Sequence, residues 1–299
     1  MTGAQIAANA LEGIRHGERK RLAAQLFNGL MYGAIGLAFL ALVALIGQTA
    51  VKGLPGLSLQ FLTNFPSRIN PSTSGAQSAI VGTVYLTLLT AVFVIPVGIA
   101  TALYLEEYAD KTRWWNRLIE VNIQNLAAVP SVVYGILGLA FIVRGPLGLG
   151  PVLLAGGLTL GLLVLPVVII VARESIRAVP PSIRDGALAL GATKWQTVSR
   201  QVLPSARAGI VTGVILSLSR AIGETAPLLV IGAASSPRFN PSGLNDAFTA
   251  LPIQIFTWTQ DPNPQFVDQA ATASIVLLLI LLGMNGIAIV LRNRYEQRW

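Results

Sequence analysis

Residues 177–227 have the sequence RAVPPSIRDGALALGATKWQTVSRQVLPSARAGIVTGVILSLSRAIGETAP, and they decide how the rest of the chain is interpreted. The first half of this stretch is polar, basic and interrupted by proline, although strongly apolar segments lie on both sides of it. The second half is apolar except for Arg220 and Glu224, which are four residues apart. The first half is typical of a docking surface outside a membrane, and the second of a spanning helix that carries buried charge.

The composition predicts a membrane protein. Hydrophobic residues make up 53% of the chain and charged residues only 11%, whereas an ordinary soluble domain has roughly 25% charged residues. Cysteine is absent and the only histidine, His16, lies in a polar N-terminal segment. A disulfide framework and thiolate metal ligation are therefore excluded, and we expect no metal site, no cofactor and no histidine-centred catalysis in the membrane.

Six apolar segments are each long enough for a spanning helix of about 20 residues. They cover about 29–51, 79–104, 121–143, 152–172, 205–232 and 270–291. The expected fold is thus an all-α integral membrane protein with a transmembrane domain over residues 22–291. A tail at 1–21, a loop at 173–204 and a tail at 292–299 complete the expected organisation.

The positive charges predict the orientation. Sixteen of the 21 Lys and Arg residues lie in the two tails, in the loop between spans two and three, and around loop 173–204. Four lie on the opposite side, and Arg220 lies within a span. The positive-inside rule then places both termini and loop 173–204 in the cytoplasm. Because topology accounts for the basic residues, nucleic-acid binding is disfavoured.

Loop 173–204 is predicted to contain two short helices. A capping box formed by Ser182 and Asp185 would start the first helix, and Gly191 would end it with a positive φ. The motif Thr193-x-x-Gln196 would start the second helix, which Leu203-Pro204 would close. Small side chains in this loop are expected to form a low-relief surface. This surface is either a docking surface or part of an amphipathic interfacial linker, and periodicity alone does not decide between the two.

The motif in this loop resembles the EAA loop of bacterial ABC importer permeases. Its residues are Asp185, Gly186, Ala187, Gly191, Leu203 and Pro204. The family has Glu-Ala-Ala where this chain has Asp-Gly-Ala, but the spacing to the central glycine and to Leu-Pro is the same. The resemblance implies a type I importer permease fold, in which this loop is a coupling helix that docks into the cytoplasmic ATPase.

Other stretches resemble the permeases of phosphate importers. They are residues 82–109 and 125–141, the motif Arg-Ala-Ile-Gly-Glu-Thr-Ala-Pro from Arg220, and the Ala-Leu-Pro-Ile-Gln-Ile-Phe stretch from Ala250. Gly-Glu-Thr-Ala-Pro favours a PstA-type subunit, while residues 172–175 resemble the PstC type at least as much. The resemblance implies a multi-pass protein of the bacterial inner membrane with four kinds of partner. These are a PstC-type second permease, a PstB-type ATP-binding dimer, a PstS-type extracytoplasmic phosphate-binding protein, and phosphate itself.

ATP hydrolysis is not expected on this chain. A phosphate-binding loop needs Gly-Lys-Ser/Thr, and no lysine follows a glycine here. The chain is therefore predicted to be a transporter subunit and not an enzyme. Three alternatives remain open: a permease for another oxyanion such as sulfate or molybdate, an ion-coupled secondary transporter, and a membrane scaffold without transport activity.

The expected substrate pathway consists of Arg220, Glu224, Thr225 and Arg173. On a continuous helix, Arg220 and Glu224 would lie on the same face. A charge at mid-membrane costs roughly 2.5–3.5 kcal/mol, so the pair either locks a dry helix contact or lines a polar pathway. In a pathway, the arginine fork suits two phosphate oxygens. Glu224 could accept a hydrogen bond from the proton that phosphate carries and sulfate lacks.

Overall fold

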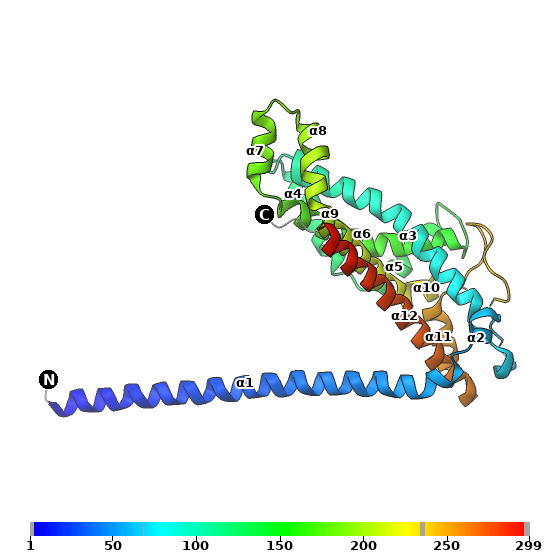
Figure 1. Ribbon diagram of the computed structural model, residues 1–299, viewed down its shortest axis with the longest axis horizontal. Helices are drawn as coiled ribbons and strands as arrows, with labels where there is room; N and C mark the ends of the chain where they lie inside the picture. The colour runs from blue at the N-terminus through cyan, green and yellow to red at the C-terminus, as the bar shows by residue number, and fades with distance from the viewer. Residues whose placement is uncertain (1–2, 68, 234–236, 296–299) are drawn as a thin grey trace. The chain divides into compact units, whose positions relative to one another are not determined.

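The computed structural model describes residues 3–67, 69–233 and 237–295, with side chains described for 24–67, 69–233 and 237–294. The chain divides into two compact units, residues 1–51 and 52–299. The described residues of the first unit belong to one helix, α1 (Gly3–Gly53), which ends two residues into the second unit (Figure 1). The helix therefore includes most of the polar stretch that we expected to form a tail at 1–21. This stretch is rich in Ala, Glu, Lys, Arg and Leu, which are strong helix formers.

The second unit is built around four long helices, α3 (Gln77–Leu103), α6 (Leu153–Arg177), α9 (Leu203–Ile222) and α12 (Pro264–Tyr295). Helix α3 packs against α6, α6 packs against α9, and α9 packs against α12 (Figure 1). Glycines on α6 allow α3 to approach closely, because a Cβ atom at Gly157 or Gly161 would lie 2.6 Å from Leu89 or Phe93. Helix α6 thus lies at the centre of the bundle.

Five helical segments are long and apolar enough to span a membrane, and a bent helix pair supplies a sixth. The expectation of an all-α membrane protein is therefore confirmed, and the described residues contain five candidate spans, or six if the bent pair forms one span. Within the described residues, β pairing is limited to one bridge between Val152 and Ala247. The last helix continues through Tyr295, and the remainder of the expected tail at 292–299 lies outside the described residues.

The third predicted span, 121–143, is wrong as a continuous helix. Its residues belong to α4 (Trp114–Ala127) and α5 (Ser131–Leu137), with a π-helical turn at Gly138–Val143, and the pair is bent by 109°. Pro130 causes the break, since it lacks an N–H group and disfavours the helical conformation of the residue before it.

The fifth predicted span, 205–232, ends ten residues earlier than expected. Helix α9 stops at Ile222, and the short helix α10 (Ala226–Val230) begins after a break. Gly223 and Pro227 explain the stop, because glycine is a poor helix former and proline cannot continue a helix. At its other end, α9 is continuous with α8 (Lys194–Thr197) through a π-helical turn at Val198–Val202.

Different elements form the two ends of the bundle (Figure 1). At the α7 end lie α7 (Pro181–Ala189), α8 and the π-helical turn Tyr104–Tyr108 that follows α3. At the α11 end lie α2 (Leu59–Thr63) and α11 (Leu251–Thr259), together with the 3-10 turns Leu54–Gly56 and Pro71–Thr73. The rings of Phe61 and Trp258 meet there, with centroids 6.0 Å apart.

A loop at the α11 end caps the start of α6. The Leu153 and Leu154 N–H groups donate to the carbonyls of Asp246 and Leu244, both at 2.9 Å. The Asp246 carboxylate accepts hydrogen bonds from the Ser242 hydroxyl and backbone N–H, both at 2.7 Å, and from a glycine N–H at 2.9 Å. The Ser242 hydroxyl contributes most to holding the pKa of Asp246 below its ordinary value. The ionised carboxylate therefore stabilises this loop.

Candidate functional site

Arg220 lies beside a small pocket at the middle of the bundle. The pocket has a volume of about 20 Å³, room for about one water molecule. Its lining comes from the α4–α5 break, α6 and α9, and comprises Leu126, Ala127, Val129, Tyr134, Leu163, Val164, Val167, Ser217 and Arg220. The contributing residues of α6 lie midway along that helix. The α4–α5 break, which we did not predict from the sequence, thus forms one wall of this mid-depth pocket.

Arg220 and Glu224 are neighbours, but the helical argument that placed them together was wrong. Helix α9 ends at Ile222, and the Glu224 N–H donates to the Ala221 carbonyl at 3.1 Å in a turn beyond the helix. The Arg220 Nε and Glu224 Oε1 atoms are 3.8 Å apart, an ion-pair distance longer than a hydrogen bond. The two side chains are 65% and 17% exposed.

The Arg220 guanidinium has unused hydrogen-bonding capacity. It carries five N–H donors in a planar fork, and Glu224 is its one charged contact among the described residues. An arginine in this state at mid-bundle is suited to an anion with two oxygens side by side. The largely apolar wall of the pocket lowers the local dielectric on one side, which strengthens an electrostatic contact there.

Thr225 is half-buried at the start of α10, next to the Arg220–Glu224 turn. Helix α10 packs closely on α5, because a Cβ atom at Gly135 would lie 2.7 Å from the Cα atom of Pro227. The Gly-Glu-Thr-Ala-Pro segment is therefore fixed against the helix that follows the α4–α5 break. The structure brings Thr225, Glu224 and Arg220 into one region.

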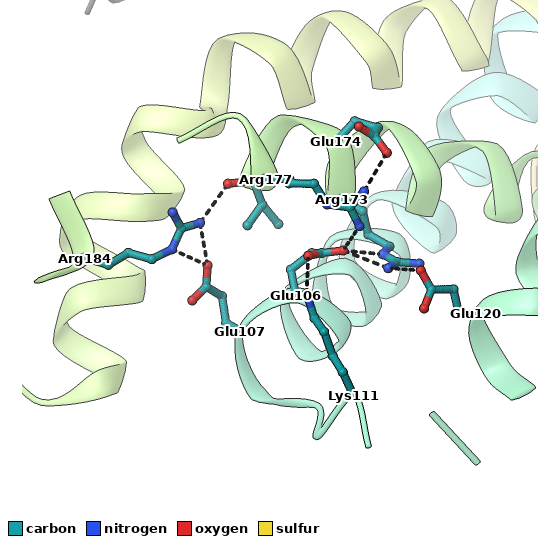
Figure 2. Close-up of polar contacts among 9 residues, drawn as sticks. Glu106, Glu107, Lys111, Glu120, Arg173, Glu174, Arg177 and Arg184 are labelled. Carbon is teal, nitrogen blue, oxygen red and sulfur yellow. Dashed lines mark hydrogen bonds and ion pairs between the residues drawn. The ribbon is translucent and has the colours of Figure 1, made fainter. Parts of the chain in front are cut away.

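Arg173 does not belong to this region. It lies ten residues beyond Leu163 along α6, about 15 Å toward the α7 end at ~1.5 Å per residue. Its buried guanidinium bonds the Glu106 carboxylate at 2.8 Å and the Glu120 carboxylate at 2.6 Å (Figure 2). The four predicted pathway residues thus separate into two groups, and Arg173 is part of an ion-pair cluster.

The ion-pair cluster connects three helices at the α7 end (Figure 2). Glu106, on the π-helical turn after α3, contacts Arg173 and Arg177 of α6 at 2.8 and 2.7 Å and Lys111 at 3.7 Å. Glu120 adds α4 through its bond to Arg173. Sequence reasoning assigned Arg173 to the substrate pathway and predicted none of these ion pairs, since they join positions up to 71 residues apart.

The predicted coupling residues occupy two environments. Asp185, Gly186 and Gly191 are exposed on α7 and the turn after it, and Ala187 is half-buried. The other two, Leu203 and Pro204, are half-buried in the continuous helix that leads into the bundle. The prediction that Leu203-Pro204 closes a separate short helix is wrong. The π-helical turn ends at Val202, and Leu203 and Pro204 form the first turn of α9 in a helix that continues from α8.

The predicted helix caps in loop 173–204 can be compared with the observed ends of α7 and α8. The Ser182–Asp185 capping box is wrong, because α7 starts at Pro181 without any side-chain cap; proline at the first helical position has a preset φ. The capping box of Thr193 and Gln196 is confirmed by reciprocal bonds of 2.9 and 3.3 Å. Gly191 has a φ of +83°, as predicted for the end of the first helix.

Comparison with known proteins identifies the family. Residues 94–299 match the family of binding-protein-dependent transport system inner membrane components. The chain belongs to this family. This transport permease is 31% identical over 250 residues to the phosphate transport system permease protein PstA of Yersinia pestis, covering 84% of this chain and 83% of the relative. It is 34% identical to PstA 1 of Mycobacterium tuberculosis over 218 residues, covering 73% and 70%. The resemblance to PstA-type permeases is confirmed.

Solved structures support the permease fold. A chain of a bacterial alginate ABC transporter, in complex with an alginate-bound periplasmic protein, superimposes with a TM-score of 0.64. It is 17% identical, and the alignment covers 92% of this permease and 95% of that chain. A chain of the inward-facing MetNI methionine ABC transporter gives a TM-score of 0.61 at 15% identity, covering 72% and 94%. The ABC importer permease fold expected from the EAA-like loop is thus confirmed.

Proposed function

We propose that this permease is a subunit of an ATP-driven phosphate importer, in which it lines the translocation pathway and transmits work from a separate ATPase. Relatives named as phosphate transport permeases, 31–34% identical over most of the chain, support the choice of phosphate. The family supports the dependence on partner chains. A second permease, an ATP-binding dimer and an extracytoplasmic phosphate-binding protein would complete the assembly in the bacterial inner membrane.

The geometry of Arg220 is the observation that carries this proposal. Its fork lies at mid-bundle, largely exposed and without a full set of partners among the described residues. Two parallel N–H···O bonds to adjacent phosphate oxygens would satisfy it, a pattern that a lysine ammonium cannot reproduce. Glu224 at 3.8 Å would orient the guanidinium and face the protonated oxygen of the bound phosphate.

The α7 surface supports the coupling part of the proposal. Helix α7 buries none of its residues and presents Asp185 and Gly186 to the outside. A Cβ atom at Gly186 would meet nothing within 4 Å, so this low-relief face is open to a partner. With loop 173–204 in the cytoplasm, as the positive charges predict, the partner would be the ATPase, and the ATPase-coupling residues would be Asp185, Gly186, Ala187, Gly191, Leu203 and Pro204.

ATP-driven uptake in proteoliposomes tests the function. The permease would be reconstituted with its three partners, and uptake of labelled phosphate measured with Arg220→Lys and Arg220→Ala. Both variants should assemble and lose uptake, because neither offers the bidentate fork. Arg144→Lys, at an exposed arginine outside the pocket, is the matched control and should retain uptake. Normal uptake by Arg220→Lys would contradict the proposed role.

The same assay distinguishes the alternative functions. Uptake driven by an ion gradient without ATP would favour a secondary transporter, and a preference for sulfate would favour a permease for another oxyanion.

A further inference from the structure

The Arg184 side chain belongs to α7 but extends back to the bundle. Its Nε and Nη2 atoms donate to Glu107 Oε1 at 3.0 and 2.9 Å. Nη1 donates to the Val179 carbonyl at 2.6 Å and Nη2 to the Ile176 carbonyl at 2.9 Å. Figure 2 shows the guanidinium between the Glu107 carboxylate and the end of α6. The two ionic side chains are 23% and 10% exposed, so water competes weakly for this contact.

These four hydrogen bonds reach two different helices. Ile176 lies in the last turn of α6 and Val179 two residues beyond the helix, where carbonyl groups lack helical partners and a positive charge is favourable. Glu107 lies on the π-helical turn after α3. Helix α7 has no fully buried residue, and Ile183 is its partly buried contact with the hydrophobic core. Arg184 is therefore the main polar attachment of α7 to both long helices.

The adjacent carboxylate fixes the two long helices to each other. Glu106 bonds Arg173 and Arg177 of α6 without involving α7. Lys194 of α8 lies 5.0 Å from the ring centroid of Tyr108 on the same π-helical turn, a weaker and exposed contact. A displacement of α7 would consequently reach α3 and α6 together, and α6 lines the Arg220 pocket.

We propose that Arg184 is a positioning residue which couples α7 rigidly to α3 and α6, and that its pair with Glu107 stays closed throughout the transport cycle. This inference rests on the proposed coupling function of α7. It assigns a mechanical role to two residues outside the EAA-like motif itself. A pair that opened during the cycle would instead release the bundle from the ATPase at each turnover.

Neutral variants separate coupling from folding. In the assembled complex, Arg184→Gln and Glu107→Gln should keep basal ATP hydrolysis and lose uptake per ATP hydrolysed by about tenfold or more, the factor expected for loss of a charged hydrogen bond. Arg184→Lys should give an intermediate ratio, because it keeps the charge and loses the fork. Arg200→Gln is the control, since Arg200 is an exposed basic residue near α8 and its loss should leave the ratio unchanged. An unchanged ratio in both Gln variants would overturn the proposal.

A reversible cross-link tests whether the pair stays closed. The natural chain has no cysteine, so Glu107→Cys with Arg184→Cys gives two unique thiols for a short bifunctional methanethiosulfonate. Cross-linking should proceed equally with and without ATP, should restore uptake, and should lose this effect on reduction. A yield that falls with ATP, or a cross-linked complex that hydrolyses ATP without uptake, would show that the pair must open. The ATP dependence of the yield does not require phosphate transport, so it remains decisive if the wild-type complex fails to take up phosphate.

Discussion

Arg220 and Glu224 differ in exposure, 65% against 17%, although they form one ion pair. The Arg220 side chain is therefore accessible from outside the bundle, whereas the Glu224 carboxylate lies close to the α9–α10 turn. A carboxylate beside an anion site repels the anion unless the anion can donate a hydrogen bond to it. Phosphate carries such a proton at neutral pH and sulfate does not, so we propose that Glu224 discriminates between them.

We predict that Glu224→Gln slows phosphate transport and weakens its selectivity over sulfate. The amide keeps the size of the side chain but removes the charge that excludes a fully ionised anion. Uptake of labelled phosphate in competition with sulfate measures the effect. Glu174→Gln, at an exposed carboxylate of the α7 end, should leave the selectivity unchanged. Normal transport with full sulfate exclusion would instead make Glu224 a packing partner.

At this scale the sequence predicted contacts between neighbouring residues better than contacts between distant ones. The adjacency of Arg220 and Glu224 followed from their spacing, because a four-residue turn brings them together even where the helix has ended. The partners of Arg173 could not be predicted, since Glu106 and Glu120 lie 67 and 53 residues away. Such pairs depend on how α3, α4 and α6 pack, and local periodicity contains no information on that packing.

At the scale of the elements, the turn after α7 requires a residue with a positive φ. The Gly191 N–H donates to the Leu188 carbonyl at 2.9 Å, and the Ala192 N–H donates to the Ala187 carbonyl at 3.1 Å. Together these two bonds form a Schellman motif, which places its glycine in the left-handed region. The φ of +83° at Gly191 meets that requirement.

Gly191→Val should leave the permease inserted but impair binding to the ATPase or phosphate-stimulated ATP hydrolysis. A left-handed residue with a side chain costs roughly 1–2 kcal/mol, so the turn would open and α7 would change direction. Copurification of the ATPase and stimulated hydrolysis are the measurements. Gly283→Ala is the control, because Gly283 lies within α12, outside the coupling loop, and an added methyl group there meets nothing within 4 Å. Undiminished uptake by Gly191→Val would mean that Gly191 is an ordinary loop residue.

The Asp246 loop gives a prediction about pH. Its lowered pKa means that the ionised form favours the fold, so its contribution is present above the unfolded pKa and lost as pH falls through the folded pKa. Asp246→Ala should lower the thermal unfolding midpoint in detergent at pH 7. The difference from wild type should shrink below about pH 4, the ordinary range for aspartate. Asp268→Ala, at an exposed position on α12, should change the midpoint little, and an equal loss at both positions would contradict the argument.

Sequence signals located most elements but misjudged where several begin or break. The Thr193–Gln196 box was predictable because both of its bonds are local. Ser182 failed as a cap because the competing proline at 181 already starts the helix. The 109° bend at Pro130 was missed because apolar residues continue on both sides, and hydropathy does not record direction.

At the scale of the whole molecule, the α7 end and the α11 end lie far apart along the bundle (Figure 1). The membrane orientation can therefore be tested by labelling residues at each end. The orientation itself rests on the distribution of Lys and Arg. We expect single cysteines at Ser72 and Asn263, exposed near the α11 end, to react with a membrane-impermeant maleimide added to intact cells. Cysteines at Ser182 and Ala192 should react only after the membrane is opened. Labelling of Ser182 in intact cells would contradict the orientation and, with it, the contact to a cytoplasmic ATPase.

The continuity of α8, the π-helical turn and α9 has a mechanical consequence. Residues Lys194–Ile222 form one helical rod, about 40 Å long at ~1.5 Å per residue. One end of this rod lies beside α7, and Arg220 lies near the other. A rotation of about 10° at the α8 end would move the far tip by roughly 7 Å, given that rise per residue. If this rod turned as a rigid body, it would act as a lever arm, and a small rotation at its α8 end would displace Arg220 by several ångströms.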